Sequence, residues 1–227
     1  MKYENIGSRL LMAASLVCDG KIVCDVGCDH GKLSLYLIKS GKAQHVIATD
    51  INKMPLQKAV DLFKENNISD RAEFLLTDGL QGIENTDDIT HVVIAGLGGE
   101  TMAQIIENAA FIKKNKTKLV LVPAQSGSRI REYLYKNGFS ITGETTVNEK
   151  KKFYSAITAE YTGEIIEPTV YDCYIGKSEK CNDESAKGYF EMVLSQLEKR
   201  AKGKVIDTGS CPEDILIAVE KVKQLLN

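Results

Sequence analysis

One stretch near the N-terminus, residues 21–37 with the sequence KIVCDVGCDHGKLSLYL, limits most strongly what this chain can fold into. It begins with an apolar run typical of a buried strand, passes through a turn bounded by Gly27 and Gly31, and continues with leucines at helical spacing. A strand, a glycine turn and a helix in so few residues form the unit from which doubly wound α/β domains build a nucleotide site. The bare turn lets a ligand approach the backbone, and the helix start favours an anionic group.

The acidic side chains inside this turn indicate which ligand it suits. A dinucleotide fingerprint reads G-x-G-x-x-G and needs small uncharged residues against the pyrophosphate. Here Asp25 and Asp29 flank Gly27 and Cys28, and these carboxylates would repel a pyrophosphate. S-adenosylmethionine carries a sulfonium and an ammonium and no phosphate, so the turn predicts a site for that cofactor. The alternative is an ordinary strand–turn–helix that happens to contain Asp and Gly.

Composition narrows the class of protein further. A chain of 227 residues with 43% hydrophobic residues can bury one sizeable core and a small appendage. Lys+Arg 29 against Asp+Glu 31 gives no overall positive charge for nucleic acid, although a local basic patch is compatible with these totals. No apolar run approaches the ~18 residues of a membrane span, and the N-terminus lacks a signal-peptide pattern, so we expect a soluble cytoplasmic protein. The spacing of the six cysteines fits neither a disulfide framework nor a zinc site, so we expect reduced thiols and no metal.

The order of apolar runs along the chain predicts the fold. Five strands, each ended by turn residues, alternate with amphipathic helices, and two further β-rich runs at 139–147 and 153–161 form a hairpin around a polar turn. The expected strands of the first set are 22–24, 45–49, 72–76, 91–95 and 118–122, and the expected helices include 5–17, 101–110 and 128–136. This predicts a doubly wound, Rossmann-like α/β fold with a seven-stranded sheet of the class I methyltransferase type, mostly parallel with an antiparallel terminal hairpin. Two helices at 187–202 and 212–226, separated at Gly203 and Gly209, would form a C-terminal helical hairpin, which divides the chain into a 1–163 cofactor-binding domain and a 164–227 helical domain.

Three aspartates follow three successive strands. Asp25, Asp50 and Asp78 each stand at a carboxyl end, where open α/β sheets bind their ligands. Asp50 is placed to accept from ribose hydroxyls, with Ile51 beside it, and Asp78 with Gly79 fits an acid that reaches the adenine edge. A dinucleotide enzyme would account for Asp50 but not for Asp78, and a helix cap is the alternative for Asp78 alone.

With these motifs in place, the chain resembles the TrmK-type tRNA (adenine-22 N1)-methyltransferases over nearly its whole length. The shared motifs are Arg9-Leu10, Asp25-Val26-Gly27-Cys28-Asp29-His30, Asp78-Gly79-Leu80, Ala95-Gly96-Leu97-Gly98-Gly99, Ile130-Arg131-Glu132-Tyr133-Leu134, Asn137-Gly138-Phe139 and the spaced Glu144, Val147, Glu149, Lys152 and Tyr154. The glycine stretch after the fourth strand is the specific part, because most nucleic-acid amino methyltransferases have an Asn/Asp-Pro-Pro-Tyr-like motif there. Two stretches depart from the family pattern, Gly31-Lys32-Leu33-Ser34 where Ala-Tyr-Leu-Pro is usual, and Val122-Pro123-Ala124-Gln125 where a Gln-Pro-Asn-like sequence is usual.

The resemblance implies transfer of a methyl group from S-adenosylmethionine to N1 of adenine 22 in tRNA. We expect the protein to be a monomer without metal. N1 attacks as a neutral atom and becomes cationic, so a carboxylate that accepts from the exocyclic amine would stabilise the developing charge. Asp29 is expected in this role, with His30 as a second catalytic residue. The expected cofactor-binding residues are Asp25, Gly27, Cys28, Asp50, Ile51, Asp78, Gly79, Ala95 and Gly96, and the expected substrate-binding residues are Gly98, Gly99, Lys32, Arg129, Arg131 and Tyr154.

Three other functions stay open at this point. The departures from the family pattern favour a methyltransferase that acts on another RNA site or on a small molecule. A non-catalytic RNA-binding module could keep the fold without turnover, and a nicotinamide-dependent oxidoreductase is the most distant alternative.

Overall fold

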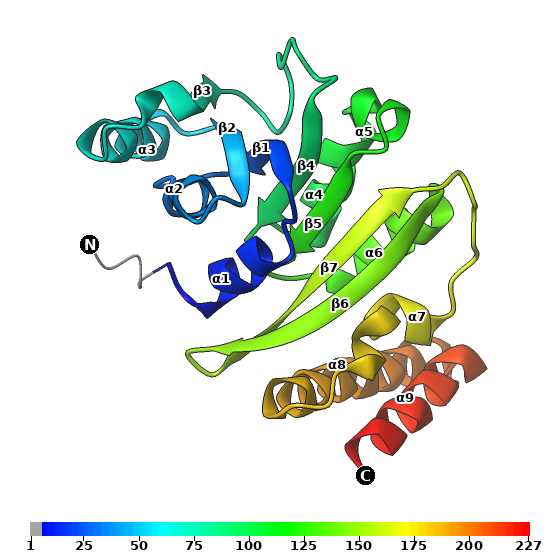
Figure 1. Ribbon diagram of the computed structural model, residues 1–227. Coiled ribbons are helices and arrows are strands. Elements are labelled where there is room, and N and C mark those ends of the chain that lie inside the picture. The colour runs from blue at the N-terminus through cyan, green and yellow to red at the C-terminus, as the bar shows by residue number, and fades with distance from the viewer. Residues whose placement is uncertain (1–5) are drawn as a thin grey trace.

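The computed structural model describes residues 6–227, and its centre is a single twisted sheet with helices on both faces (Figure 1). The strands are β1 (Gly20–Val26), β2 (Ala43–Asp50), β3 (Ala72–Leu76), β4 (Ile89–Ala95), β5 (Lys118–Val122), β6 (Phe139–Glu149) and β7 (Lys152–Tyr161). They form a 7-stranded sheet in the order β3-β2-β1-β4-β5-β7-β6. The first five strands are parallel, and β7 runs antiparallel to both β5 and β6. This confirms the predicted fold class.

Apolar residues on both sides of the sheet explain the layers. The helices α1 (Ser8–Ser15), α2 (Lys32–Lys39) and α3 (Lys53–Glu65) cover one face, and α4 (Gly99–Glu107), α5 (Ala110–Lys114) and α6 (Gly127–Lys136) cover the other (Figure 1). The central strands are therefore buried on both faces and read as nearly continuous apolar runs. A short 3₁₀ helix at Ser69–Arg71 leads into β3. The chain order reverses between β1 and β4, so the carboxyl ends of these two strands mark the switch point where such sheets bind ligands.

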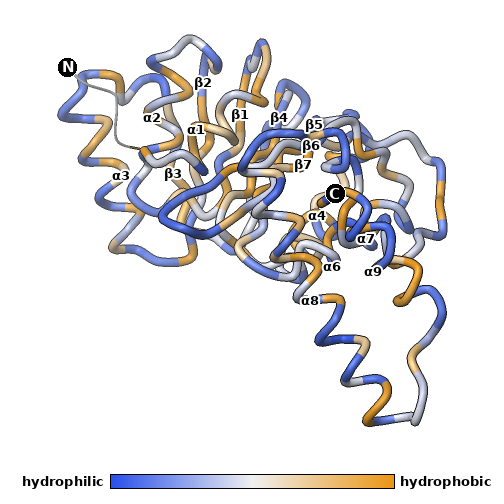
Figure 2. The backbone as a smooth tube through the Cα atoms, turned by 90° about the horizontal axis from the view of Figure 1, so that it is seen from below, coloured by the Kyte–Doolittle hydropathy of each residue, from blue (hydrophilic) through white to orange (hydrophobic). Residues whose placement is uncertain are grey.

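The C-terminal part packs beside the β6–β7 hairpin. It consists of α7 (Val170–Tyr174), a 3₁₀ helix at Gly176–Lys180, α8 (Glu184–Thr208) and α9 (Glu213–Leu226). Its small core joins Phe190, Val193 and Leu197 of α8 to Ala218 and Val222 of α9. Figure 2 shows that the outer part of α8 and the turn into α9 project away from the rest of the molecule.

Several elements differ from the sequence expectations. Helix α8 runs through Gly203 and ends only at Gly209, whose φ of +78° supplies the left-handed cap that a glycine accommodates best. Since an exposed glycine inside a helix costs only about 1 kcal/mol relative to alanine, the rest of the helix tolerates Gly203. Helix α1 begins at Ser8 with Gly7 as its N-cap, and the expected start at residue 5 lies outside the described residues. The segment after Pro168 forms α7, a helix that the sequence analysis did not predict, behind a capping box of Thr169 and Asp172.

Two findings bear on the environment of the chain. Among residues 6–227 no helix is long and apolar enough to cross a bilayer. Over the same residues all six cysteines are free thiols, with Cys24, Cys28 and Cys173 buried. Burial raises the pKa of Cys24 to about 12, so this thiol stays protonated at neutral pH and is not a nucleophile.

Candidate active site

The turn after β1 is held rigidly against its neighbours. The N–H groups of Gly27 and Cys28 both donate to the carbonyl of Thr49 at 2.9 Å, which fixes the turn to the end of β2. Gly27 and Gly31 have φ values of +70° and +68°, a conformation that residues with side chains rarely adopt. A Cβ on Gly31 would also lie 2.7 Å from Cβ of Ala59 in α3. The two glycines are therefore required by the backbone path and, at Gly31, by close packing.

Asp25 lies at the floor of the site, almost completely buried with 3% exposed. The hydroxyl of Ser34 donates to its Oδ2 at 2.6 Å. Burial raises the pKa of Asp25 to about 6; the hydrogen bond from Ser34 opposes this rise, and the nearby charge of Asp50 adds to it. A cation placed over this carboxylate would stabilise its charged form, so the buried acid is suited to a positively charged ligand.

Asp50 fixes the backbone on which Asp29 stands. Its Oδ2 accepts from the backbone N–H of Asp29 at 3.1 Å, and its Oδ1 accepts from the N–H of Asn52 at 2.8 Å. Asp29 has a φ of +50°, and its side chain is 70% exposed. Asp50 therefore has a structural task at the turn in addition to its expected contact with ribose.

His30 connects Asp29 to a lysine of α3. Its Nδ1 lies 2.7 Å from Oδ1 of Asp29, and its Nε2 lies 3.1 Å from Nζ of Lys58. Because the ammonium of Lys58 can only donate, Nε2 accepts and the proton of a neutral imidazole is on Nδ1, from where it is donated to Asp29. The chain Lys58–His30–Asp29 thus orients the Asp29 carboxylate at the mouth of the turn.

A cavity of about 80 Å³ lies over the turn and is lined by both carboxylates and cations. Asp25 and Asp29 contribute the negative charges, and Arg9 and Lys32 the positive ones. Within residues 6–227 the buried Nε of Arg9 has no hydrogen-bond partner. The guanidinium carbon of Arg9 lies 5.4 Å from the ring centre of Tyr154. A buried donor without a partner favours an acceptor supplied by a ligand.

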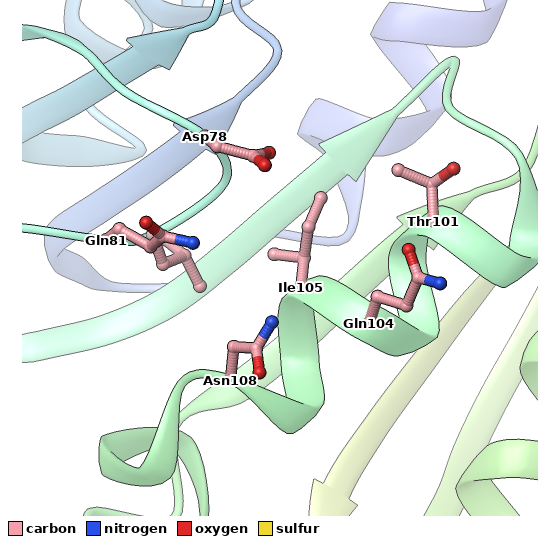
Figure 3. Close-up of a pocket in the computed structure, with 7 residues that line it drawn as sticks. Asp78, Gln81, Thr101, Gln104, Ile105 and Asn108 are labelled. Carbon is pink, nitrogen blue, oxygen red and sulfur yellow. The ribbon is translucent and has the colours of Figure 1, made fainter.

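A second cavity of about 150 Å³ lies at the end of β3, beside α4 (Figure 3). Asp78 and three amide side chains, Gln81, Gln104 and Asn108, line it together with Thr101. Hydrogen bonds tie this region to the end of β2: the N–H of Thr77 donates to the carbonyl of Asp50 at 3.0 Å, and the hydroxyl of Thr49 donates to the carbonyl of Gly79 at 2.7 Å. The three strand-end aspartates therefore lie on connected turns, with Asp25 and Asp78 lining separate cavities.

Gly96 and Gly99, which follow β4, allow close packing in the folded protein, whereas the sequence analysis assigned them to ligand binding. Gly96 has a φ of +100°, and the guanidinium of Arg9 fills the space beside it. Gly99 was expected to bind substrate, but the carbonyl of Ser126 fills the space beside it and leaves no room for a substrate group. The N–H of Gly99 donates to the carbonyl of Gln125 at 3.0 Å. The lack of a side chain at Gly99 lets two backbones approach closely.

The expectation that Arg131 binds substrate is wrong. Arg131 is fully buried, and its guanidinium lies 2.6 Å from Oε2 of Glu144, 2.9 Å from the hydroxyl of Ser155 and 3.0 Å from the hydroxyl of Tyr189. Another of its N–H groups donates to the carbonyl of Cys173 at 3.3 Å. These bonds join α6 to β6, α7 and α8, and they make the guanidinium inaccessible to a phosphate.

The remaining predicted substrate residues lie near the surface. Lys32 is exposed and lines the turn cavity, whereas Arg129 is exposed and forms an ion pair of 3.2 Å with Glu132. Ser34 and Lys58 were not predicted as site residues, because their roles depend on contacts with Asp25 and His30 in other elements. It also missed Gln104 and Asn108, although their helical spacing from Thr101 could have indicated a polar face on α4.

Comparisons with known proteins identify the family and the fold. Residues 6–157 match a family described as "Methyltransferase domain". The chain is 29% identical over 160 residues to the tRNA (adenine(22)-N(1))-methyltransferase of Bacillus subtilis. This match covers 70% of this chain and 67% of that protein. Its fold is similar to that of Sp1610 of Streptococcus pneumoniae in complex with S-adenosyl-L-methionine, with a TM-score of 0.83 and 26% identity over 98% of this chain and 100% of the other. The crystal structure of the B. subtilis m1A22 tRNA methyltransferase TrmK gives a TM-score of 0.81 at 21% identity, over 98% of this chain and 99% of that one, which shows the fold alone.

Proposed function

Because this chain belongs to the methyltransferase-domain family and is a class I enzyme of the TrmK type, we propose that it transfers a methyl group from S-adenosylmethionine to N1 of adenine 22 in tRNA. The observation that supports this proposal most directly is the cavity over the glycine turn, which both carboxylates and cations line. A zwitterionic methionine moiety with an adjacent sulfonium matches that arrangement, and a pyrophosphate does not.

At the methionine end, Asp25 would receive the ammonium and Arg9 the carboxylate of the cofactor. Asp25 is the buried acid of the cavity, and Arg9 has the buried Nε that lacks a partner within the described residues. Gly27, Cys28, Ala95 and Gly96 surround this part with backbone and small side chains. Arg9 is thereby assigned to the cofactor.

At the nucleoside end, Asp50 keeps lone pairs for the ribose hydroxyls after it has accepted from two backbone N–H groups. Ile51, an exposed apolar side chain, can cover one face of the adenine ring. Asp78 would accept from the adenine amine, with Gly79 beside it. The neighbouring amides of the second cavity can hydrogen-bond the remaining polar atoms of the base (Figure 3).

In the transfer step, the lone pair on adenine N1 forms a bond to the methyl carbon while the carbon–sulfur bond breaks. The sulfonium becomes a neutral thioether, and the positive charge passes to the adenine ring. We assign Asp29 to accept from the exocyclic amine of that ring, because its exposed carboxylate stands at the mouth of the cavity. His30 and Lys58 orient Asp29 and need not transfer a proton.

The substrate atom lies on the Watson–Crick edge, so the adenine has to leave its stack before it can react. Lys32 and Arg129, both exposed, are available to tRNA phosphates, and Tyr154 and Gly98 stand near the path of the base. A tRNA substrate implies a cytoplasmic protein, and a single chain contains the whole proposed site, which is compatible with a monomer.

The test is methyl transfer from labelled S-adenosylmethionine to unmodified tRNA, followed by digestion to nucleosides and mass spectrometry. The expected product is 1-methyladenosine. A methylated nucleoside of another kind would support the second candidate, a methyltransferase for a different RNA site, which the departures at Gly31–Ser34 favour. Absence of any methylated nucleoside, with the cofactor bound, would contradict both.

A further inference from the structure

A cavity larger than the one over the glycine turn lies between α8 and the loop that follows β5. Its volume is about 460 Å³, compared with about 80 Å³ over the glycine turn. One wall is the 125–128 segment, the floor is the start of β7, and the other wall is α8. We name this cavity the α8 groove. Met192, Gln196 and Lys199 project into it at helical spacing from α8.

The groove combines the side chains that bind an unpaired nucleotide. The rings of Phe153, Tyr154 and Tyr174 line the groove and are partly exposed, and aromatic rings of this kind stack on bases. Gln125 and Gln196 are exposed amides that can donate to and accept from a base edge, and Lys199 adds a positive charge. The volume also falls in the range of about 300–1,000 Å³ found for small-ligand pockets. A purely apolar ligand would leave these polar groups without partners.

Two contacts connect the groove to the proposed methyl-transfer site. The ring of Tyr154 lines the groove, and the guanidinium of Arg9 above it lines the turn cavity, with 5.4 Å between ring centre and guanidinium carbon. Gln125 lines the groove and pairs with Gly98 as an isolated parallel bridge. The turn cavity and the groove are therefore neighbours, with Arg9 lining the first and the adjacent ring of Tyr154 lining the second.

We propose that the α8 groove holds the nucleotide of tRNA that adjoins the target adenine, in an unpaired conformation. Its base stacks on the aromatic floor, and its phosphate lies toward Lys199 and the first N–H groups of α6 at Gly127 and Ser128. This proposal rests on the proposed function and adds a second nucleotide site to it. It also gives the C-terminal helices a task, because α8 supplies a whole wall of the groove.

The first test fills the groove. Gln196→Trp places a large ring in it, and Ser195→Trp puts the same ring on an adjacent exposed position of α8 that does not line the groove. We expect Gln196→Trp to raise the KM for an unmodified tRNA transcript about tenfold or more, since stacking is worth about 1–3 kcal/mol per base. Ser195→Trp should leave this KM unchanged, and calorimetry should give both variants the wild-type affinity for S-adenosylmethionine.

The second test locates the nucleotide. A photoreactive benzoylphenylalanine at position 196 should cross-link to unmodified tRNA at a nucleotide next to adenine 22, the proposed target of methylation. Cross-links confined to distant nucleotides, or a Gln196→Trp variant with the KM of wild type, would overturn the groove proposal while wild-type methyl transfer remains intact. Failure of the wild-type protein to methylate tRNA would instead overturn the proposed function.

Discussion

The hydrogen bond from Ser34 changes the pKa of Asp25 in this site. The TrmK-type pattern has proline where this chain has Ser34, and only the serine can donate the 2.6 Å hydrogen bond to Asp25. This bond opposes the effect of burial and lowers the pKa of Asp25, which still reaches about 6. The departure from the family pattern therefore has a physical consequence: it keeps the buried carboxylate easier to ionise, as a cationic ligand requires.

The raised pKa of Asp25 predicts an effect on stability as well as on binding. Between pH 4 and about 6 the folded protein holds a proton on Asp25 that the unfolded chain has lost, so the free energy of unfolding falls as pH rises through this window. Above pH 6 the buried Asp25 is charged in the folded protein, and the full loss of folding stability is present. The rise of its pKa from 3.8 to about 6 corresponds to a loss of about 3 kcal/mol.

Asp25→Asn should therefore make the cofactor-free protein more stable than wild type at pH 8, and equally stable near pH 4. Urea unfolding at several pH values measures this. The same variant should bind S-adenosylmethionine much more weakly at pH 8, by calorimetry. An unchanged stability profile would show that Asp25 is not buried in the way described.

Asp29 is the residue on which the assigned chemistry depends. Asn tolerates the φ of +50° and keeps the backbone bond to Asp50, so Asp29→Asn removes only the charge. We expect single-turnover methyl transfer to slow roughly a hundredfold or more, with the affinity for S-adenosylmethionine within a few-fold of wild type. Asp70→Asn, in the 3₁₀ helix before β3, serves as a control. Wild-type turnover in Asp29→Asn would remove Asp29 from the mechanism.

At the scale of elements, the Arg131–Glu144 ion pair joins parts of the chain that are far apart in sequence. It links α6 to β6, and the same guanidinium also contacts β7, α7 and α8 through Ser155, Cys173 and Tyr189. A buried pair of this kind contributes little when compared with apolar residues, but removal of one partner leaves the other charge unpaired.

Arg131→Met should therefore reduce the free energy of unfolding by about 3–5 kcal/mol, because Glu144 would remain buried without a counter-charge. Arg129→Met, two residues away and exposed, should change it by less than about 1 kcal/mol. Urea denaturation followed by circular dichroism measures both. Equal, small effects would mean that water reaches Glu144 in the folded protein.

The same pair shows where the sequence was informative and where it was not. The strands, their order along the chain and the aspartates at their ends follow from apolar runs and turn residues, which are local signals. Arg131 reads as an exposed cation on an amphipathic helix, because its partner Glu144 is 13 positions away and Tyr189 is 58 positions away. The α8 groove was invisible for the same reason, since it exists only once α8 packs beside the 123–128 loop. Gly203 misled the helix prediction because a glycine often, but not always, ends a helix.

At the scale of the whole molecule, we propose that residues 1–163 and 164–227 are distinct units that unfold together. The C-terminal core of α8 and α9 is separate from the two sheet cores, yet Phe153 of β7 packs against it and Tyr189 of α8 bonds to Arg131. The interface between the two units contains the buried Arg131–Glu144 ion pair. Separation of the units would expose both charges, so we expect the units to unfold together.

This coupling predicts one unfolding transition. The chain contains no tryptophan, so Ser195→Trp introduces a single fluorophore in α8 that reports on the C-terminal unit alone. Its fluorescence transition in urea should coincide with the circular dichroism transition of the whole chain. Two separate midpoints would show that the helices unfold independently of the sheet.

In the whole molecule, the acidic glycine turn receives the methyl donor and one adenine of tRNA receives the methyl group. The most direct measurement compares two unmodified transcripts that differ only at position 22, adenine in one and guanine in the other, in methyl transfer from labelled S-adenosylmethionine. We predict incorporation into the adenine transcript and only background label in the guanine transcript. Equal incorporation into both would contradict the claim.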